Sequence, residues 1–261
     1  MRHASLRHIA RFFCSILLIA CVVWGGLQLW HKRHVRGVLR VVAVCAPDGI
    51  MHSDTTYTGL QYNLLRQMAD SCNMQITITL YRTLDSCINA LKHGDADLLT
   101  HALPGTTALR KQLNVTTPLY SDALYLIEAD TAPHATNITA LEGDTIYTES
   151  CSPYAQQLLA PLDEAGVHCT VVTADSANNG TLATLLMQGS IQMIACNKLS
   201  AKALQQTYPT LHIGMTLGVQ QPMVWTMTDH LQQADTINAW ATQLKDLKAL
   251  HRAIAESFGT H

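Results

Sequence analysis

The residues with the clearest chemical potential lie just after a Pro-Gly break at residues 104–105. Two adjacent threonines, Thr106 and Thr107, follow the break, and Arg110 comes three residues later. Either threonine can cap the start of a helix, where free backbone N–H groups can bind an anion. A guanidinium group adds a forked donor that matches a carboxylate or a phosphate. The segment therefore predicts an anion site, although a capped helix with a solvated arginine would give the same pattern.

Alternating strand and helix patterns precede this segment and must position it. Residues 37–47, 75–81 and 97–102 are apolar or β-branched runs that predict strands. Residues 59–72 and 84–93 carry apolar positions at helical spacing. Strands that alternate with helices across short loops predict a parallel sheet covered by helices.

The same pattern restarts after a linker rich in Pro, Thr and Asn that ends at Thr139. Two similar α/β lobes would place a ligand cleft between them, at the carboxyl ends of the strands. A strand at Gln221–Met227 is expected to return towards the first lobe, followed by one or two helices in residues 232–258. In the second half we expect strands at residues 143–148, 167–173 and 191–196 and helices at residues 153–165, 182–189 and 199–207.

Composition limits the class of partner. The chain has 261 residues, of which 48% are hydrophobic and 14% charged, enough for one large or two small domains with real cores. A formal net charge of −2 provides no basic field for nucleic acid. We therefore expect a small-molecule ligand and no nucleic-acid partner.

The N-terminal segment, residues 1–35, contains an uncharged run from Phe12 to Trp30. A run of about 19 apolar residues can cross a bilayer as a helix. Leu18-Ile-Ala-Cys21 also matches a lipoprotein signal, in which Cys21 would be acylated after cleavage. The apolar run continues past Cys21, so the sequence favours an uncleaved signal anchor.

Cysteine and histidine spacing predicts neither a metal site nor a cofactor. The sequence contains no Cys-x-x-Cys and no histidines spaced for zinc. Disulfides are permitted if the domain is exported, but spacing alone does not reveal their pairing. The six cysteines outside the apolar run are Cys45, Cys72, Cys87, Cys151, Cys169 and Cys196.

Five short motifs occur in a characteristic order. They are Leu39-Arg-Val-Val, Thr58-Gly-Leu-Gln-Tyr-Asn-Leu-Leu, Gly94-Asp-Ala-Asp-Leu-Leu, Thr107-Ala-Leu-Arg and Thr117-Pro-Leu-Tyr. With these motifs the chain resembles the family 3 extracellular solute-binding proteins from residue 38 to about residue 258. Within that family it looks most similar to the solute-binding domain of membrane-bound lytic transglycosylase F.

The resemblance implies an α/β type II periplasmic binding fold. In that fold two lobes are joined by two crossing strands and close on a ligand like a hinge. It implies a first lobe of residues 38–127 and 222–261 and a second lobe of residues 128–221. It also implies a place in the bacterial cell envelope, with the binding domain in the periplasm and the N-terminal segment at the membrane.

The resemblance also implies ligand-binding residues. Arg110 would hold the carboxylate of an amino-acid-like or peptide-like solute. Asn197 stands where the family has an aspartate for the ligand ammonium, and Ser152 lies in the anion turn of the second lobe, where Cys151 replaces a glycine. Because an amide cannot pair with an ammonium, we expect free amino acids to bind less well than N-acylated amino acids or peptides. The other candidates for lining the cleft are Thr106, Thr107, Tyr57, His101 and Tyr120.

Two functions stay open at this point. One is a membrane-anchored receptor that binds a small solute and either feeds an ABC transporter permease or acts as a sensor. The other is a relative of the transglycosylase without catalysis, which binds peptidoglycan fragments or a protein of the cell-wall machinery. A transglycosylase needs a further helical domain with a catalytic glutamate, so we expect no enzymatic activity. The Glu-Ser pairs at residues 149–150 and 256–257 are interpreted as chance matches to that domain.

Overall fold

The computed structural model describes residues 38–130, 133–244 and 248–258. The predicted anchor in residues 1–35, with Cys21, lies outside the described residues. Among the residues that are described, no helix is both long and apolar enough to cross a membrane.

The first lobe is built on a sheet of six described strands. They are β1 (Val38–Val44), β4 (Gln75–Tyr81), β5 (Leu98–Pro104), β6 (Asn114–Val115), β7 (Tyr120–Asp122) and β13 (Gln221–Met227). The strand order is β4-β1-β5-β13-β6, and β7 also pairs with β13. β1 runs parallel to β4 and β5, whereas β13 runs antiparallel to β5. The predicted parallel core is therefore present, with one returning antiparallel strand.

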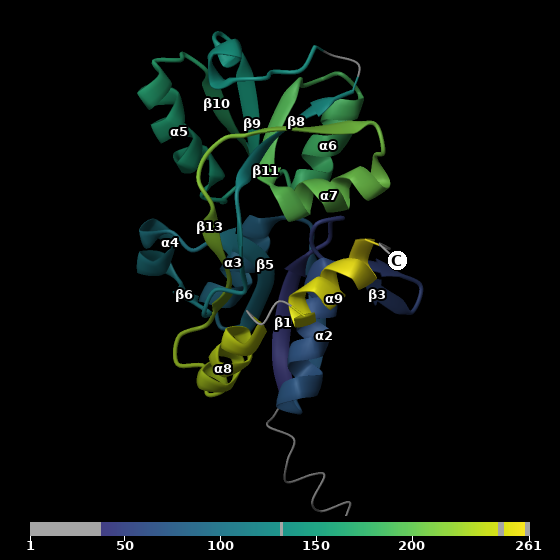
Figure 1. Ribbon diagram of the computed structural model, residues 1–261. Helices are drawn as coiled ribbons and strands as arrows, with labels where there is room; N and C mark the ends of the chain where they lie inside the picture. Colours follow the sequence, from purple (N-terminus) through teal and green to yellow (C-terminus); the bar gives the residue numbers. More distant parts are fainter. Residues whose placement is uncertain (1–37, 131–132, 245–247, 259–261) are drawn as a thin grey trace, which may run out of the picture.

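Helices cover both faces of this sheet (Figure 1). On one face α2, α8 and α9 pack around the buried Trp225, whose ring stacks on that of Trp240 with centroids 5.8 Å apart. On the other face α3 packs against β1 and β5. The helices are α2 (Leu60–Cys72), α3 (Leu84–Lys92), α4 (Thr107–Gln112), α8 (Ala234–Leu244) and α9 (Lys248–Phe258), and a hairpin is formed by β2 (Met51–Ser53) and β3 (Thr56–Thr58).

The second lobe has a five-stranded sheet of its own. The strands are β8 (Leu124–Ala129), β9 (Thr145–Glu149), β10 (Thr170–Ala174), β11 (Met193–Asn197) and β12 (Leu211–Thr216), in the order β10-β9-β11-β8-β12. One face is covered by α5, and the other by α6 and α7. The helices are α5 (Tyr154–Ala165), α6 (Asn179–Met187) and α7 (Lys198–Thr207), with a short 3-10 helix at Ile138–Leu141.

The chain crosses between the lobes twice. β7 pairs in the first sheet and β8 in the second, so the first crossing is at Ala123. The second crossing lies between β12 and β13, at residues 217–220. The predicted boundary at residue 127 lies inside β8, which pairs in the second sheet, so the first crossing comes earlier than predicted. Only Ala123 separates β7 from β8, so no loop marks the crossing.

Most helix starts follow from capping side chains. Thr106 is the N-cap of α4, and its hydroxyl accepts a hydrogen bond from the backbone N–H of Leu109 at 3.1 Å. Asn178 caps α6 in the same way, accepting from the N–H of Thr181 at 2.8 Å, so α6 begins three residues before the predicted start at Leu182. A polar side chain at the N-cap satisfies backbone donors that a helix leaves free.

Candidate functional site

A buried ion pair joins the two lobes directly. His101 lies in β5 of the first lobe and Glu149 at the end of β9 in the second. The His101 Nε2 atom is 2.9 Å from Glu149 Oε2, and both side chains are buried. The predicted cleft residue His101 thus faces the second lobe. Glu149 was interpreted as part of a chance dipeptide, yet it provides the partner.

A second polar contact lies beside this pair. Asp48 follows β1, and its Oδ2 accepts a hydrogen bond at 2.7 Å from the side-chain amide of Asn179, the first residue of α6. Both residues are buried. The neighbouring Asn178 donates to the carbonyl of Arg82 at 2.6 Å, again from the second lobe to the first. The start of α6 is therefore tied to the loops that follow β1 and β4.

Acidic side chains outnumber the histidine at this contact. Burial lowers the pKa of His101, but Glu149 and Asp48 together raise it to about 9, so the ring is protonated at neutral pH. Burial raises the pKa of Glu149, and the charge of Asp48 adds to this rise, while His101 opposes it. One histidine therefore faces two acidic side chains, and a cationic or hydrogen-bond-donating group of a ligand would suit this contact.

Several buried polar atoms at this contact have no hydrogen-bond partner among the described residues. Buried polar groups in proteins are normally paired, so such atoms concentrate at sites that bind something else. Three of the atoms are acceptors, which suit a ligand that donates hydrogen bonds. The atoms are Asp48 Oδ1, Glu149 Oε1, Asn179 Oδ1, His101 Nδ1 and Ser150 Oγ.

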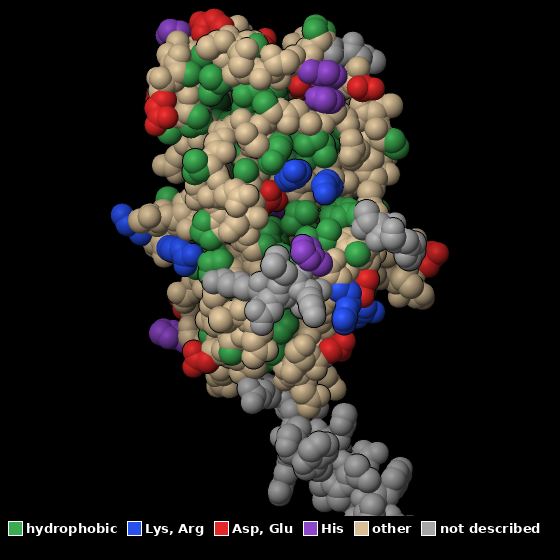
Figure 2. All heavy atoms as spheres, in the orientation of Figure 1, with side chains coloured by type: hydrophobic (Ala, Val, Ile, Leu, Met, Phe, Trp, Pro, Cys, Tyr) green, Lys and Arg blue, Asp and Glu red, His purple; other side chains and the backbone are tan. Residues whose placement is uncertain are grey.

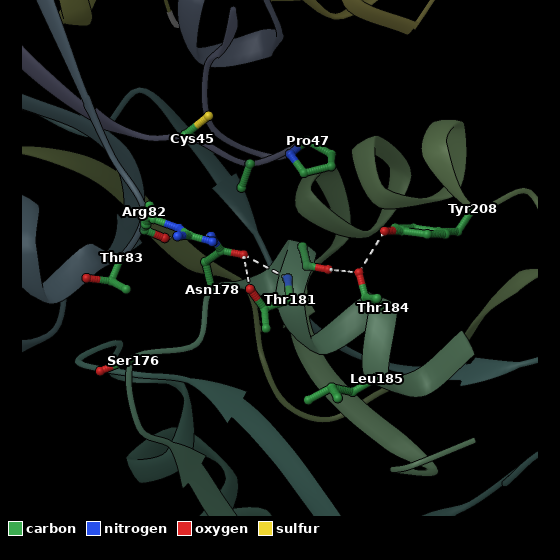
Figure 3. A pocket seen from close by; sticks show the side chains of 12 residues that line it. Cys45, Pro47, Arg82, Thr83, Ser176, Asn178, Thr181, Thr184, Leu185 and Tyr208 are labelled. Carbon is green, nitrogen blue, oxygen red and sulfur yellow. Dashed lines mark hydrogen bonds between the residues drawn. The ribbon is translucent and has the colours of Figure 1, made fainter. Parts of the chain in front are cut away.

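A cavity of about 770 Å³ lies between the lobes (Figure 3), lined by Pro47, Asn178 and Gly180, which are chain neighbours of Asp48 and Asn179, but by none of the five residues named above. The first lobe lines it with Pro47 and with Arg82, whose side chain reaches towards Asn178 at the start of α6. The second lobe contributes the first turns of α6 and Tyr208. A Cβ on Gly180 would lie only 3.0 Å from Pro47 Cδ, so glycine lets the lobes approach here.

Arg110 and its neighbours lie apart from the cavity. Arg110 and Thr107 are exposed, and the Arg110 Nε–H donates to the carbonyl of Gly105 at 3.1 Å. Thr106 is used as the helix cap. The three residues come together as predicted, but none of them lines the cavity or contacts the His101–Glu149 pair in this conformation.

The second-lobe candidates support the local fold. Asn197 is buried and caps α7, accepting from the N–H of Ser200 at 2.9 Å while its amide donates to the Tyr154 hydroxyl at 2.7 Å. The Ser152 hydroxyl donates to the Glu149 carbonyl at 2.8 Å. Cys151 has a φ of 56°, the left-handed conformation that glycine adopts most easily, which agrees with its expected place at a glycine position.

The two tyrosines differ in position. Tyr120 is buried, and its pKa is raised by burial and by the nearby Asp122 and Asp48, so it lies close to the polar cluster. Tyr57 belongs to the β2–β3 hairpin, where its ring packs 4.5 Å from His52 and 5.6 Å from Tyr62. Both tyrosines therefore pack in the first lobe, Tyr120 within its core and Tyr57 against it.

Cysteine pairing, which spacing left open, is partly answered by the structure. Cys45, Cys87, Cys151, Cys169 and Cys196 are free thiols. Burial raises the pKa of the Cys87 thiol to about 12, and Glu149 adds to the effect, so this thiol is an inert core group.

Asp48, Arg82 and Asn179 were not among the residues predicted from the sequence. All three follow a predicted strand or precede a predicted helix, the positions that meet at the carboxyl edge of a parallel sheet. That signal was available, but it is shared by many other polar residues of the chain.

Comparisons with known proteins agree with this geometry. The family model for bacterial extracellular solute-binding proteins, family 3, matches residues 40–259. Membrane-bound lytic murein transglycosylase F of Pectobacterium atrosepticum is 23% identical over 225 residues, which cover 83% of this chain and 47% of the relative. The enzyme of the same name from Aeromonas hydrophila is 24% identical over 227 residues, covering 85% and 45%. The chain thus spans about half the length of these relatives.

Solved structures share the fold. An ancestral arginine-binding protein has a TM-score of 0.70 when bound to glutamine and 0.69 when bound to arginine, at 18% identity, with 87% of this chain and 100% of that chain covered. The GluR0 ligand-binding core in complex with L-glutamate has a TM-score of 0.67 at 17% identity, covering 85% and 98%. Together with the family match over nearly all described residues, this shows that the chain belongs to the family 3 bacterial extracellular solute-binding proteins.

Proposed function

We propose that this protein binds a small amino-acid-like or peptide-like solute, which carries a carboxylate, between its two lobes in the bacterial cell envelope. The observation that supports this most is the buried, acceptor-rich contact of Asp48, His101, Glu149 and Asn179 beside the interlobe cavity. The volume of this cavity, about 770 Å³, lies within the range of about 300–1,000 Å³ typical of small-molecule pockets.

The two ends of such a solute would meet different groups. An ammonium or amide N–H would donate to Asp48 Oδ1 and Glu149 Oε1, the acceptors that lack partners among the described residues. A carboxylate would be held by Arg82 and the start of α6, where the helix dipole favours an anion. Arg110 is the alternative residue for binding the carboxylate, and its side chain would have to move into the cavity to do so.

This assignment changes the expected ligand preference. The preference for N-acylated compounds depended on the absence of a carboxylate at Asn197. Asn197 is instead engaged with Ser200 and Tyr154, and the acidic side chain proposed to meet the ligand amine is Asp48, whose Oδ1 has no hydrogen-bond partner among the described residues. We therefore expect free amino acids to be accepted.

The remaining parts of the proposal come from the relatives. We infer that the N-terminal segment anchors the domain to the membrane, that the domain itself has no catalytic role, and that an ABC transporter permease receives the solute. A second candidate is favoured by the relatives named lytic murein transglycosylase F. In that case the same cleft would bind a murein peptide fragment, and the partner would be cell-wall machinery.

Calorimetry on the full chain tests the site. The ligands are free amino acids, N-acetyl amino acids and muropeptides, and the variants are Asp48→Asn, Arg82→Ala, Arg110→Ala and Asn197→Asp. Removing one partner of a buried charge pair costs about 2 kcal/mol or more, so Asp48→Asn should weaken binding of a free amino acid about 30-fold or more. Arg66→Ala is the matched control, because Arg66 is exposed in α2 and its carboxylate partner is Glu256 of α9.

The outcomes separate the candidates. Loss of affinity in Arg82→Ala but not in Arg110→Ala assigns the carboxylate to Arg82, and the reverse assigns it to Arg110. Binding of muropeptides in preference to amino acids favours the cell-wall function. If no compound in the panel binds, or if Asp48→Asn, Arg82→Ala and Arg110→Ala all leave affinity unchanged, the proposed cleft is wrong.

A further inference from the structure

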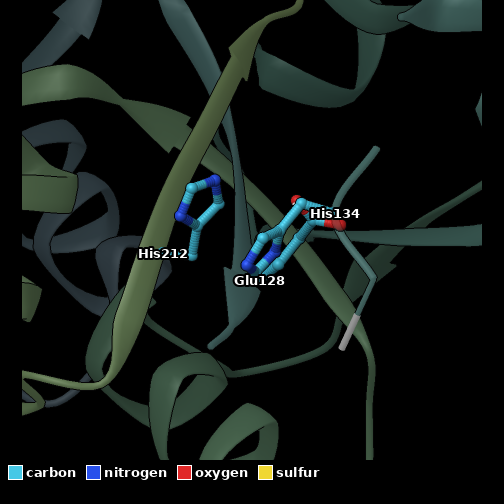
Figure 4. A group of neighbouring side chains, drawn as sticks. All are labelled: Glu128, His134 and His212. Carbon is cyan, nitrogen blue, oxygen red and sulfur yellow. The ribbon is translucent and has the colours of Figure 1, made fainter. Parts of the chain in front are cut away.

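Three potential metal ligands meet in the second lobe, outside the proposed cleft. Glu128, His134 and His212 each direct a ligating atom into a group whose atoms all lie within 4.8 Å of one another (Figure 4). None of the three lines the interlobe cavity. Histidine spacing predicted no metal site, because His134 and His212 are 78 residues apart and come together only when the second lobe folds.

Strand pairing explains why the three residues come together. β8 and β12 run antiparallel, and their register places Glu128 directly opposite His212. Residues in that relation project from the same face of a sheet with Cβ atoms about 5 Å apart. His134 returns over this face after the end of β8, and its ring stacks on that of His212 with centroids 3.7 Å apart.

The carboxylate of Glu128 is buried but only half satisfied. Its side chain is 1% exposed, and Oε1 accepts a hydrogen bond from the N–H of Ala135 at 3.1 Å. Oε2 has no hydrogen-bond partner among the described residues, and neither does His134 Nδ1, which lies 3.6 Å away from it. Leaving a buried carboxylate oxygen unpaired is costly, so the site favours a cation between these atoms.

Gly214 leaves room for this arrangement. It lies two residues after His212 in β12, and a Cβ there would come within 3.0 Å of Glu128 Oε2. A side chain at this position would therefore press on the one carboxylate oxygen that is unpaired.

We propose that Glu128, His134 and His212 bind a divalent transition metal ion of the zinc type. Bonds of about 2.0–2.2 Å in a tetrahedral site put neighbouring ligand atoms about 3.3–3.6 Å apart. The distance between Glu128 Oε2 and His134 Nδ1, 3.6 Å, matches this range. Two imidazoles and one carboxylate suit zinc-type ions better than calcium or magnesium, which prefer oxygen ligands only. Three protein ligands leave the fourth position to water.

Binding requires one movement. The two rings are within 17° of parallel, and one ion cannot lie in the planes of two stacked rings. One ring must therefore turn, and His134 is suited to this because its side chain is 28% exposed and lies outside the strands. Its Nε2 lies 3.7 Å from Asp130 Oδ1, so a ring that binds metal through Nδ1 points its other N–H towards a carboxylate, which orients metal-bound histidines in many proteins.

Zinc titration of the full chain tests the site. Calorimetry should show that the wild-type protein binds one equivalent of Zn²⁺. Each of the variants His134→Ala, His212→Ala and Glu128→Gln should lose this binding or bind Zn²⁺ at least about tenfold more weakly. His168→Ala is the matched control, because His168 lies 3.3 Å from Glu142 on the surface but belongs to no group of three ligands among the described residues. It should leave that equivalent unchanged. Equal stoichiometry and affinity in wild type and all three site variants overturns the proposal.

A measurement on wild type covers the case in which a variant fails to fold. Histidine-ring NMR signals of His134 and His212 should shift together on addition of one equivalent of Zn²⁺, whereas those of His168 should stay in place. If the His134 signals respond to pH but neither ring responds to Zn²⁺, the group is only an ion pair with Glu128 and the proposal is wrong. Because these residues lie outside the cleft, the result is independent of solute binding.

Discussion

Two histidine–glutamate contacts in this protein pair the same residue types but have different roles. His101 and Glu149 come from different lobes, are both buried and lie 2.9 Å apart. His134 and Glu128 belong to one lobe, lie 3.6 Å apart, and the histidine is partly exposed. The first contact is a closed ion pair. The second leaves a gap of the size that a metal ion fills.

The comparison shows that burial and neighbouring groups, rather than residue type, set the role. Near His101, Asp48 adds to the effect of Glu149 in favouring the protonated imidazole, and the pKa of His101 rises to about 9. Around Glu128 the extra group is a second imidazole, His212, which offers another ligand instead of another charge. An acidic neighbour favours an ion pair that holds lobes together, and a histidine neighbour favours metal binding.

Charge also distinguishes the interior of the cleft from the outer surface. On the face drawn in Figure 2, acidic and basic side chains are interspersed. At the buried contact between the lobes, two acidic residues, Asp48 and Glu149, face one histidine, His101. Selectivity for a ligand cation should therefore arise at the buried contact rather than from the field of the whole protein.

The largest effect should come from breaking the interlobe pair. His101→Ala leaves Glu149 buried without its partner, and such losses cost about 3–5 kcal/mol. We expect the free energy of unfolding in urea to fall by this amount, and small-angle scattering to show lobes that are further apart.

The double variant His101→Leu with Glu149→Leu is the control for this prediction. It removes both charges, and a buried pair can often be replaced by apolar side chains at little cost. If the single His101→Ala variant is as stable and as compact as wild type, the pair does not hold the lobes together.

His101 should also make the free energy of unfolding depend on pH, an effect of intermediate size. The pKa of His101 in the folded protein, about 9, lies above the value of about 6.5 for an unfolded histidine. Its stabilising contribution is therefore fully present below about pH 6.5 and is lost as the pH rises through 9. Unfolding measured between pH 6 and pH 10 should show this loss in wild type, whereas His101→Ala should lack it. An equal slope in both proteins would rule out His101 as its source.

The smallest effect should come from His134 when no metal is present. A partly exposed contact of this kind contributes about 1 kcal/mol or less, so His134→Ala in the presence of a chelator should change the free energy of unfolding by no more than that. Added Zn²⁺ should widen the difference from wild type, since an ion that binds only the folded state stabilises it. A loss as large as that of His101→Ala under chelator would show that the two contacts are not different in kind.

The elements of the fold could largely be predicted from local sequence. The strands at Gln75–Tyr81 and Gln221–Met227 have the predicted bounds, because alternating and β-branched residues determine an extended chain locally. Local pattern failed at β12, where Gly214 and a change of register interrupt the alternation, and at the first crossing, where Ala123 alone separates β7 from β8.

The candidate sites could be predicted only in part. His101 and Tyr120 were predicted to line the cleft because they lie near strand ends; His101 does contact the second lobe, whereas Tyr120 packs in the core of the first. Asn197 was predicted as a ligand contact from family position, and the structure gives its amide partners within the second lobe. Arg110 was placed correctly after its capped turn, but the direction of its side chain follows from the carbonyl of Gly105.

The sequence by itself determined the two α/β lobes, their order along the chain and the family. These depend on periodicity and short motifs, which are properties of neighbouring residues. Only the tertiary structure decided which side chains meet: His101 with Glu149, Asp48 with Asn179, and Glu128 with His212. Each of these contacts joins residues far apart in the chain. It forms only once strands have paired or the lobes have docked, so the local sequence does not specify it.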